Sequence, residues 1–167
     1  GEKGVDVLIG DSTNALNEGF SNSESVVDET LNEMFVKCKN NRIIIATFAS
    51  NVHRIQQILN IAYKNKRKVA LSGRSMINVI EASSKIGEIT IPKDTIVDLD
   101  KIKNIPDREL VVISTGSQGE PMSALTRMAM DDHKKVGIMP GDTVIISATP
   151  IPGNEKLVGR IINALVR

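Results

Sequence analysis

The feature that most constrains this chain is the run IIIATFASNVHRIQQ at residues 43–57. Its three consecutive isoleucines predict a strand that is buried on both faces, as in a parallel sheet. The apolar spacing from Val52 onward predicts a helix, with Ser50 or Asn51 as its cap. A strand that ends at the start of a helix presents free backbone N–H groups and a partial positive charge, which suit a phosphate. The run therefore predicts a strand–loop–helix unit able to bind phosphate.

The same arrangement recurs along the chain. Buried strands, each followed by a polar loop, are predicted at residues 5–9, 43–45, 68–72, 109–114 and 143–148. Weaker strand patterns lie at 95–99 and 136–138. Strands that alternate with helices through short connections predict a parallel sheet covered on both faces. The predicted fold class is α/β, a three-layer, doubly wound, mostly parallel sheet of the flavodoxin or Rossmann type, as a single domain over residues 1–167.

Composition narrows the possible functions. Aromatic residues make up only 2% of the chain, so rows of stacking platforms for single-stranded bases are disfavoured. The formal net charge is +1, so contact with a polyanion has to come from local patches. The single cysteine, Cys38, excludes an internal disulfide and indicates a reducing compartment. With no signal peptide and no apolar run long enough to span a bilayer, we expect a cytoplasmic protein that does not contact membranes.

Metal-binding patterns are absent from the sequence. His53 and His133 are its two histidines, and neither HxH nor HExxH spacing nor a cysteine pair occurs. His133 lies in the polar stretch DDHKK and is expected to be an exposed turn residue. The basic cluster KNKRK at 64–68 is expected to be a solvated turn at the opposite edge of the sheet rather than a phosphate contact.

The loops after the strands are expected to meet at one edge of the sheet, where open α/β sheets place their ligands. They are rich in Ser, Thr, Gly, Asn and Pro, and backbone amides and hydroxyls at helix starts suit a phosphate or a sugar-phosphate chain. Asp11 either faces this edge or only caps its own turn. Arg74 either contacts phosphate or forms a capping or interdomain salt bridge. No Ser–His–Asp set, carboxylate pair or metal cluster accompanies them, so the residues alone predict phosphate binding without a defined reaction.

Five motifs in order resemble bacterial ribonuclease J. They are GDSTN at 10–14, IIIATFASNVHRIQQI at 43–58, KVALSGRSM at 68–76, STGSQGEPMSAL at 114–125 and PGDTVIISATPIPGNE at 140–155. The part resembled is the β-CASP domain, which is inserted into a metallo-β-lactamase domain, and the likeness extends over essentially the whole chain. The resemblance implies a metal-dependent ribonuclease with 5′-to-3′ exonuclease and endonuclease activity in RNA decay and processing. It also implies two divalent metal ions, taken as zinc, in the β-lactamase part, with RNA in the cleft between the two domains.

The resemblance also implies roles for particular residues. Asp11 matches the acidic residue of the DST motif, which supports the metal centre by orienting a histidine, and is the catalytic candidate. Ser50 matches a residue near the pocket for the RNA 5′-monophosphate. The remaining candidates for RNA, phosphate or interdomain contact are Asn51, His53, Arg54, Arg74, Ser75, Ser117, Gln118 and Glu120.

The sequence also departs from the family, because the metal motif HxHxDH and the later histidine motifs are absent. We therefore expect a domain excised from a longer two-domain chain, without metal ligands and inactive alone. Its expected partners are 5′-monophosphorylated RNA, the missing metallo-β-lactamase domain and, in the full-length protein, further copies of itself. Two alternatives stay open: a free-standing phosphate- or nucleotide-binding module without catalysis, and a relative whose fold serves only as an assembly surface.

Overall fold

The computed structural model describes residues 4–10, 12, 15–16, 18–20 and 24–167. Its centre is a five-stranded sheet in the order β3-β2-β4-β1-β5, with every neighbouring pair parallel. The strands are β1 (Ile43–Ala46), β2 (Lys68–Ser72), β3 (Ile96–Val97), β4 (Leu110–Ser114) and β5 (Thr143–Ile146). The predicted parallel sheet is thus confirmed.

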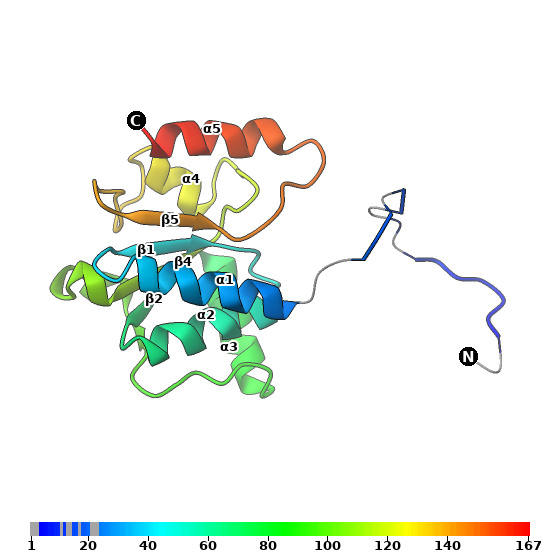
Figure 1. The fold of residues 1–167 in the computed structure, drawn as a ribbon, viewed down its shortest axis with the longest axis horizontal. Helices are drawn as coiled ribbons and strands as arrows, with labels where there is room; N and C mark the ends of the chain where they lie inside the picture. The colour runs from blue at the N-terminus through cyan, green and yellow to red at the C-terminus, as the bar shows by residue number, and fades with distance from the viewer. Residues whose placement is uncertain (1–3, 11, 13–14, 17, 21–23) are drawn as a thin grey trace.

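Helices cover both faces of the sheet, as the three-layer prediction required (Figure 1). The helices are α1 (Glu24–Lys37), α2 (Val52–Lys64), α3 (Arg74–Lys85), α4 (Ala124–Ala129) and α5 (Glu155–Leu165), with 3₁₀ turns η1 (Leu99–Asn104) and η2 (Asp107–Glu109). Residues of α1, α2 and α3 belong to one core cluster, and residues of η1, α4 and α5 belong to the other. The connections from β1 to β2 and from β2 to β3 therefore cross one face of the sheet, and the connections from β3 to β4 and from β4 to β5 cross the other.

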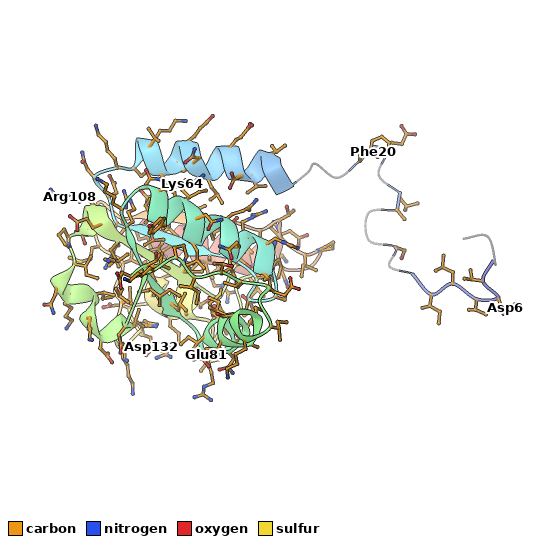
Figure 2. All side chains as sticks on the ribbon, turned by 90° about the horizontal axis from the view of Figure 1, so that it is seen from below. Asp6, Phe20, Lys64, Glu81, Arg108 and Asp132 are labelled. Atoms are coloured by element: carbon orange, nitrogen blue, oxygen red, sulfur yellow. The ribbon has the colours of Figure 1, made fainter. Side chains whose placement is uncertain are left out.

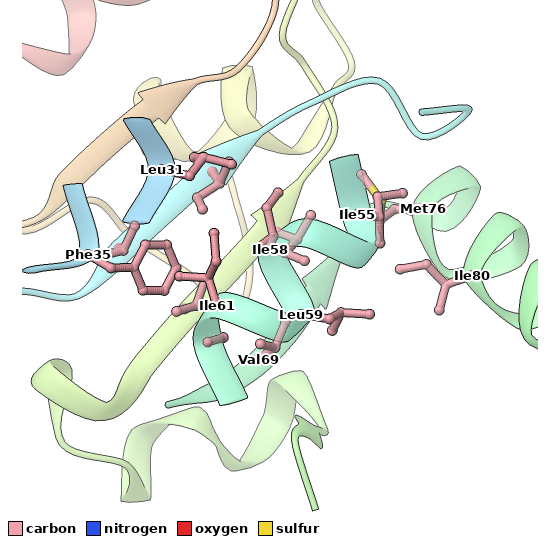
Figure 3. Packing of buried hydrophobic residues seen from close by; sticks show 14 of the residues in the cluster. Leu31, Phe35, Ile55, Ile58, Leu59, Ile61, Val69, Met76 and Ile80 are labelled. Carbon is pink, nitrogen blue, oxygen red and sulfur yellow. The ribbon is translucent and has the colours of Figure 1, made fainter. Parts of the chain in front are cut away.

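Strand β1 shows why an unbroken apolar run is needed here. Ile43 and Ile45 enter the core under α1 and α2, whereas Ile44 enters the core under α4 and α5, and all three side chains are fully buried. Full burial of one such side chain contributes about 1.5–3 kcal/mol, so both faces of β1 stabilise the fold. Figure 3 shows the first of these cores, in which Ile55, Ile58 and Leu59 of α2 pack over the sheet. The apolar helical spacing after Val52 predicted this contact.

The prediction of a first strand at residues 5–9 is wrong. The described residues 4–10 form no strand, and Val5, Val7, Leu8 and Ile9 are each more than three-quarters exposed. The apolar residues of this run therefore pack against no strand of the sheet within the described residues. The pattern at 136–138 also forms no strand, although Val136 is buried against the α4 side of the sheet.

Two buried arginines fix the opposite, amino-terminal edge of the sheet. Arg42 donates to both carboxylate oxygens of Asp142 and to the carbonyl of Gly137, which ties the start of β1 to the start of β5. Arg67 donates to the carbonyls of Cys38 and Asn41, and its burial lowers the pKa of its guanidinium. The expectation of a fully solvated KNKRK turn is therefore wrong for Arg67, which is 3% exposed.

Candidate nucleic-acid interface at the carboxyl edge of the sheet

The carboxyl ends of the four long strands lie level with one another. Ser72, Ser114, Ala46 and Ile146 are register partners across the sheet. Backbone hydrogen bonds continue one residue further, from Thr47 N–H to the carbonyl of Ser114 (3.1 Å) and from the Ser147 and Thr115 amides to the carbonyls of Ala46 and Ser72. The polar loops therefore start from a common rigid platform, as the sequence predicted.

At the start of α2 the two candidate caps have separate roles. Asn51 is the cap, and its Oδ1 accepts a hydrogen bond from Arg54 N–H at 3.0 Å. Ser50 precedes it, is exposed, and its hydroxyl forms no hydrogen bond within the described residues. His53 lies on the first turn and is also exposed. Ser50 and His53 are therefore accessible to a ligand, whereas Asn51 is engaged in holding the helix start.

Arg54 is only 7% exposed, and its guanidinium is engaged within the chain. Its Nε donates to Gln57 Oε1 at 3.1 Å, and its Nη1 donates to the hydroxyl of Ser147, which follows β5. This arginine therefore connects α2 to the β5 loop. The geometry favours a role in positioning the loops over direct phosphate contact.

The glycines after β4 allow close internal packing. A Cβ at Gly119 would lie 2.6 Å from the backbone carbon of Leu157 in α5, and a Cβ at Gly116 would lie 2.9 Å from Ser123 Cβ. Both glycines also have positive φ angles, 78° and 110°. The GxxG spacing is thus explained by contact with α4 and α5, without an anion.

Gln118, between these glycines, joins the β4 and β5 loops. Its side chain is 2% exposed, donates to the carbonyl of Thr149 (3.1 Å) and accepts from Ile151 N–H (2.7 Å) and Asn154 Nδ2 (3.3 Å). Ser117 is 1% exposed, whereas Glu120 is exposed and accepts from Gln118 N–H at 3.2 Å. Of these three, Glu120 alone presents its side chain to solvent.

Arg74 and Ser75 form the exposed first turn of α3. Neither makes a hydrogen bond or ion pair to another described side chain. Asp11, the catalytic candidate, lies outside the described residues. The structure thus brings together the candidates after β1, β2 and β4 at one edge, and leaves Asp11 unplaced.

Two further residues at this edge escaped the sequence analysis. His133, expected to be an exposed turn residue, is half-buried, and its Nε2 lies 3.0 Å from the hydroxyl of Ser72, which is itself 1% exposed. Burial, followed by the nearby charges of Arg127 and Lys135, lowers the pKa of His133. Period-two alternation could have placed Ser72 on the same face as Ala70. No local pattern predicts its contact with a residue 61 positions away.

A metal site would need a cluster of acidic, histidine or cysteine side chains. Among the described residues no three such side chains come together to hold an ion. The two divalent ions implied by the resemblance thus find no ligand set in this part of the chain. None of the helices in the described residues is long and apolar enough to cross a membrane.

The fold and the site together define a doubly wound α/β domain that presents hydroxyls, backbone amides and a few cations at one edge, a surface suited to phosphate. The sequence model of the family "Ribonuclease J, beta-CASP domain" matches residues 40–165. The chain belongs to this family.

Curated relatives named ribonuclease J are similar to this chain in sequence over nearly its full length. Ribonuclease J of Thermus thermophilus is 43% identical over 165 residues, and ribonuclease J of Synechocystis is 45% identical over 166. Ribonuclease J2 of Bacillus subtilis is 41% identical over 167 residues. These matches cover 99–100% of this chain but only 26–30% of the relatives, so the chain spans less than a third of their length.

Proposed function

We propose that this chain is the β-CASP part of a longer metal-dependent ribonuclease and that its carboxyl edge holds the RNA. The observation that carries the proposal is the convergence of the β1, β2, β4 and β5 loops at one edge, in a chain of the ribonuclease J β-CASP family. An RNA backbone is recognised mainly through phosphate contacts with amides, hydroxyls and cations, and these are the groups found there. Aromatic side chains are scarce in the chain, which agrees with backbone recognition over base stacking.

Within this proposal the residues divide into two groups. Ser50, His53, Arg74 and Ser75 are exposed at helix starts and contact RNA directly, with Ser50 nearest the 5′-monophosphate. The engaged side chains hold the loops in place, and they are Asn51, Arg54 and Gln118. Glu120 extends the surface after β4, and Ser117, which is buried beside Gln118, supports that loop from within.

Catalysis belongs to the longer protein. Asp11 supports the metal centre, and two metal ions, proposed to be zinc, are held by a metallo-β-lactamase domain rather than by the residues described here. Paired metals would activate water and stabilise the charge of phosphodiester displacement. The full-length protein is further proposed to be cytoplasmic and to assemble as a homo-oligomer.

Binding of a short 5′-monophosphorylated RNA and its 5′-hydroxyl twin across a salt series tests this function. We expect the longer protein to prefer the monophosphate and to lose affinity as salt rises, because phosphate contacts release counterions. The 167-residue chain alone is expected to bind more weakly, without cleavage. A longer protein that binds neither RNA would contradict the proposal.

Two substitutions in the longer protein test the residue assignments. Ser50→Ala should reduce the preference for the 5′-monophosphate about tenfold, the effect of one hydrogen bond to a charged group. Ser75→Ala removes another exposed hydroxyl at a helix start and serves as the control: it should lower the affinity for both RNAs alike and leave the preference for the 5′-monophosphate unchanged. Asp11→Ala should abolish cleavage while largely preserving RNA affinity, and retained turnover would remove Asp11 from the catalytic machinery.

A further inference from the structure

A crevice lies beside the candidate interface, between the carboxyl ends of β2 and β3. Strand β2 leads into α3 on one face of the sheet, whereas β3 leads into η1 on the other. Connections that depart to opposite faces open a crevice between strand ends, the place where doubly wound sheets bind ligands. The crevice measures about 1200 Å³, which exceeds the usual volume of a small-molecule site.

The walls of this crevice combine apolar surface with positive charge. The apolar part includes Leu71, Ile77, Ile96 and Leu99. The charged side chains on its rim are Arg74, Lys85, Arg127, Lys134 and Lys135, together with Glu81 and Asp98. Lys135 pairs with Asp100 and Arg127 with Asp132, both outside the lining, while Arg74 forms no ion pair within the described residues. An anion with an apolar portion is complementary to these walls.

A buried hydroxyl in the crevice wall, that of Ser72, adds an observation that does not depend on the charged side chains. His133 Nδ1 accepts from Val136 N–H (3.0 Å) and Lys135 N–H (3.3 Å), which assigns the ring hydrogen to Nε2 and makes it the donor to Ser72. The hydroxyl hydrogen of Ser72, which lines the crevice, is then left without an acceptor among the described residues. Ser114, its register partner on the same face of the sheet, is fully buried with no partner for its Oγ there. Ser114 does not line the crevice, so Ser72 alone bears on a ligand bound there. Its unpaired hydroxyl hydrogen could be satisfied by an acceptor in the crevice, such as a phosphate oxygen.

The start of α3 reinforces the same chemistry. Gly73 occupies the cap position with φ 116° and offers no side-chain cap to the first amides of this 12-residue helix. A Cβ at this position would lie 2.7 Å from Thr115 Oγ1, so the close approach of the two loops requires glycine. The free amides and the helix dipole both favour an anion at this end.

We propose that this crevice binds a nucleotide. Its phosphate lies at the start of α3, within reach of the Ser72 hydroxyl and Arg74, and its base lies against Leu71, Ile77 and Ile96. The nucleotide is a free nucleoside monophosphate or one residue of an RNA strand, which share this chemistry. The inference goes beyond the proposed function, because a free nucleotide would bind here whether or not RNA lies across the central strands.

Titration of the 167-residue chain with uridine 5′-monophosphate, uridine, inorganic phosphate and a short RNA, followed by amide NMR, tests the proposal. The monophosphate is expected to shift amides at residues 72–75 and 133–136 and to bind more tightly than uridine or phosphate. Stronger binding of the RNA at the same amides would identify a strand residue as the source, and weaker binding would identify the free nucleotide.

Variants then separate the crevice from general charge effects. Arg74→Ala should weaken nucleotide binding about tenfold, as expected for loss of one charge-assisted contact. Arg108→Ala, an exposed arginine that Figure 2 places away from Glu81 and Asp132, is the matched control and should leave binding unchanged. Ser72→Ala should also weaken binding, with thermal unfolding used to verify that it folds.

Several results would overturn the proposal. These are no saturable shifts up to about 10 mM nucleotide, equal affinity for inorganic phosphate and the nucleotide, or equal loss in the Arg74 and Arg108 variants. Shifts confined to residues 115–121 and 149–154 would assign the nucleotide to the central loops and would likewise refute the crevice. An empty crevice would not exclude RNA binding by the longer protein at the central loops, so the two proposals can fail separately.

Discussion

Replacing Gln118 with leucine tests the link between the β4 and β5 loops. Leucine is similar in size and apolar, so the substitution removes the amide group while leaving most of the volume filled. It abolishes the three hydrogen bonds to Thr149, Ile151 and Asn154. The β5 loop would then lose its main polar attachment to the β4 loop.

The expected loss of stability follows from these contacts. Hydrogen bonds contribute about 0.5–1.5 kcal/mol each, so three would contribute about 1.5–4.5 kcal/mol. Thr149 and Ile151 are exposed residues, and water can replace part of what their backbones lose. We therefore expect the free energy of unfolding to fall by about 2 kcal/mol.

Urea denaturation of the chain measures this loss, and Gln56→Leu is the control. Gln56 also makes three hydrogen bonds, to Asn60 and the backbone of Thr90, but all of them are exposed. The control should lose less than about 1 kcal/mol. In the longer protein, RNA affinity should fall for Gln118→Leu alone. Equal losses for the two glutamines, or an unchanged Gln118 variant, would refute the argument that Gln118 holds the interface together.

Two further predictions concern titration and charge burial. Because the pKa of His133 is lowered in the folded chain, the unfolded chain binds more protons, and the free energy of unfolding should fall as pH decreases below about 6.5. The pH dependence should weaken in His133→Ala but persist in His53→Ala, and urea denaturation from pH 5 to 8 would reveal an opposite ranking. Asp142→Ala should lower the free energy of unfolding by about 3–5 kcal/mol, because it leaves the buried Arg42 without its carboxylate partner. The Arg42→Met, Asp142→Leu double variant should lose much less stability than Asp142→Ala, because no buried charge remains. An equal loss of stability in the two variants would contradict the cost assigned to the lone charge.

The sequence predicted the strands that the sheet buries most deeply. The run KVALS is β2 at its full predicted length, and Ile43 to Ile45 form most of β1. Residues covered on both faces must be apolar at every position, so their pattern is unambiguous. The run at residues 5–9 is also largely apolar, but it forms no strand and its apolar side chains are exposed. An apolar pattern indicates that a segment favours burial, but it does not identify the surface that buries it.

The candidate site was predicted less completely. Loop positions were correct because parallel strands bring their carboxyl ends together, but the roles of side chains depend on distant partners. Arg54 and Gln118 were expected to contact RNA, and their bonds to Ser147 and Ile151 come from segments more than 30 residues away. His133 looked exposed in a run of charged residues, and only the folded chain brings its ring to Ser72.

Hydrogen exchange of the longer protein, with and without 5′-monophosphorylated RNA, tests the central claim most directly. RNA held at the carboxyl edge should slow exchange at residues 47–51, 114–121 and 147–154. The amino edge, including the turn at 64–67, should exchange at an unchanged rate. Protection confined to the amino edge, or RNA binding that leaves the carboxyl-edge loops unprotected, would contradict the account.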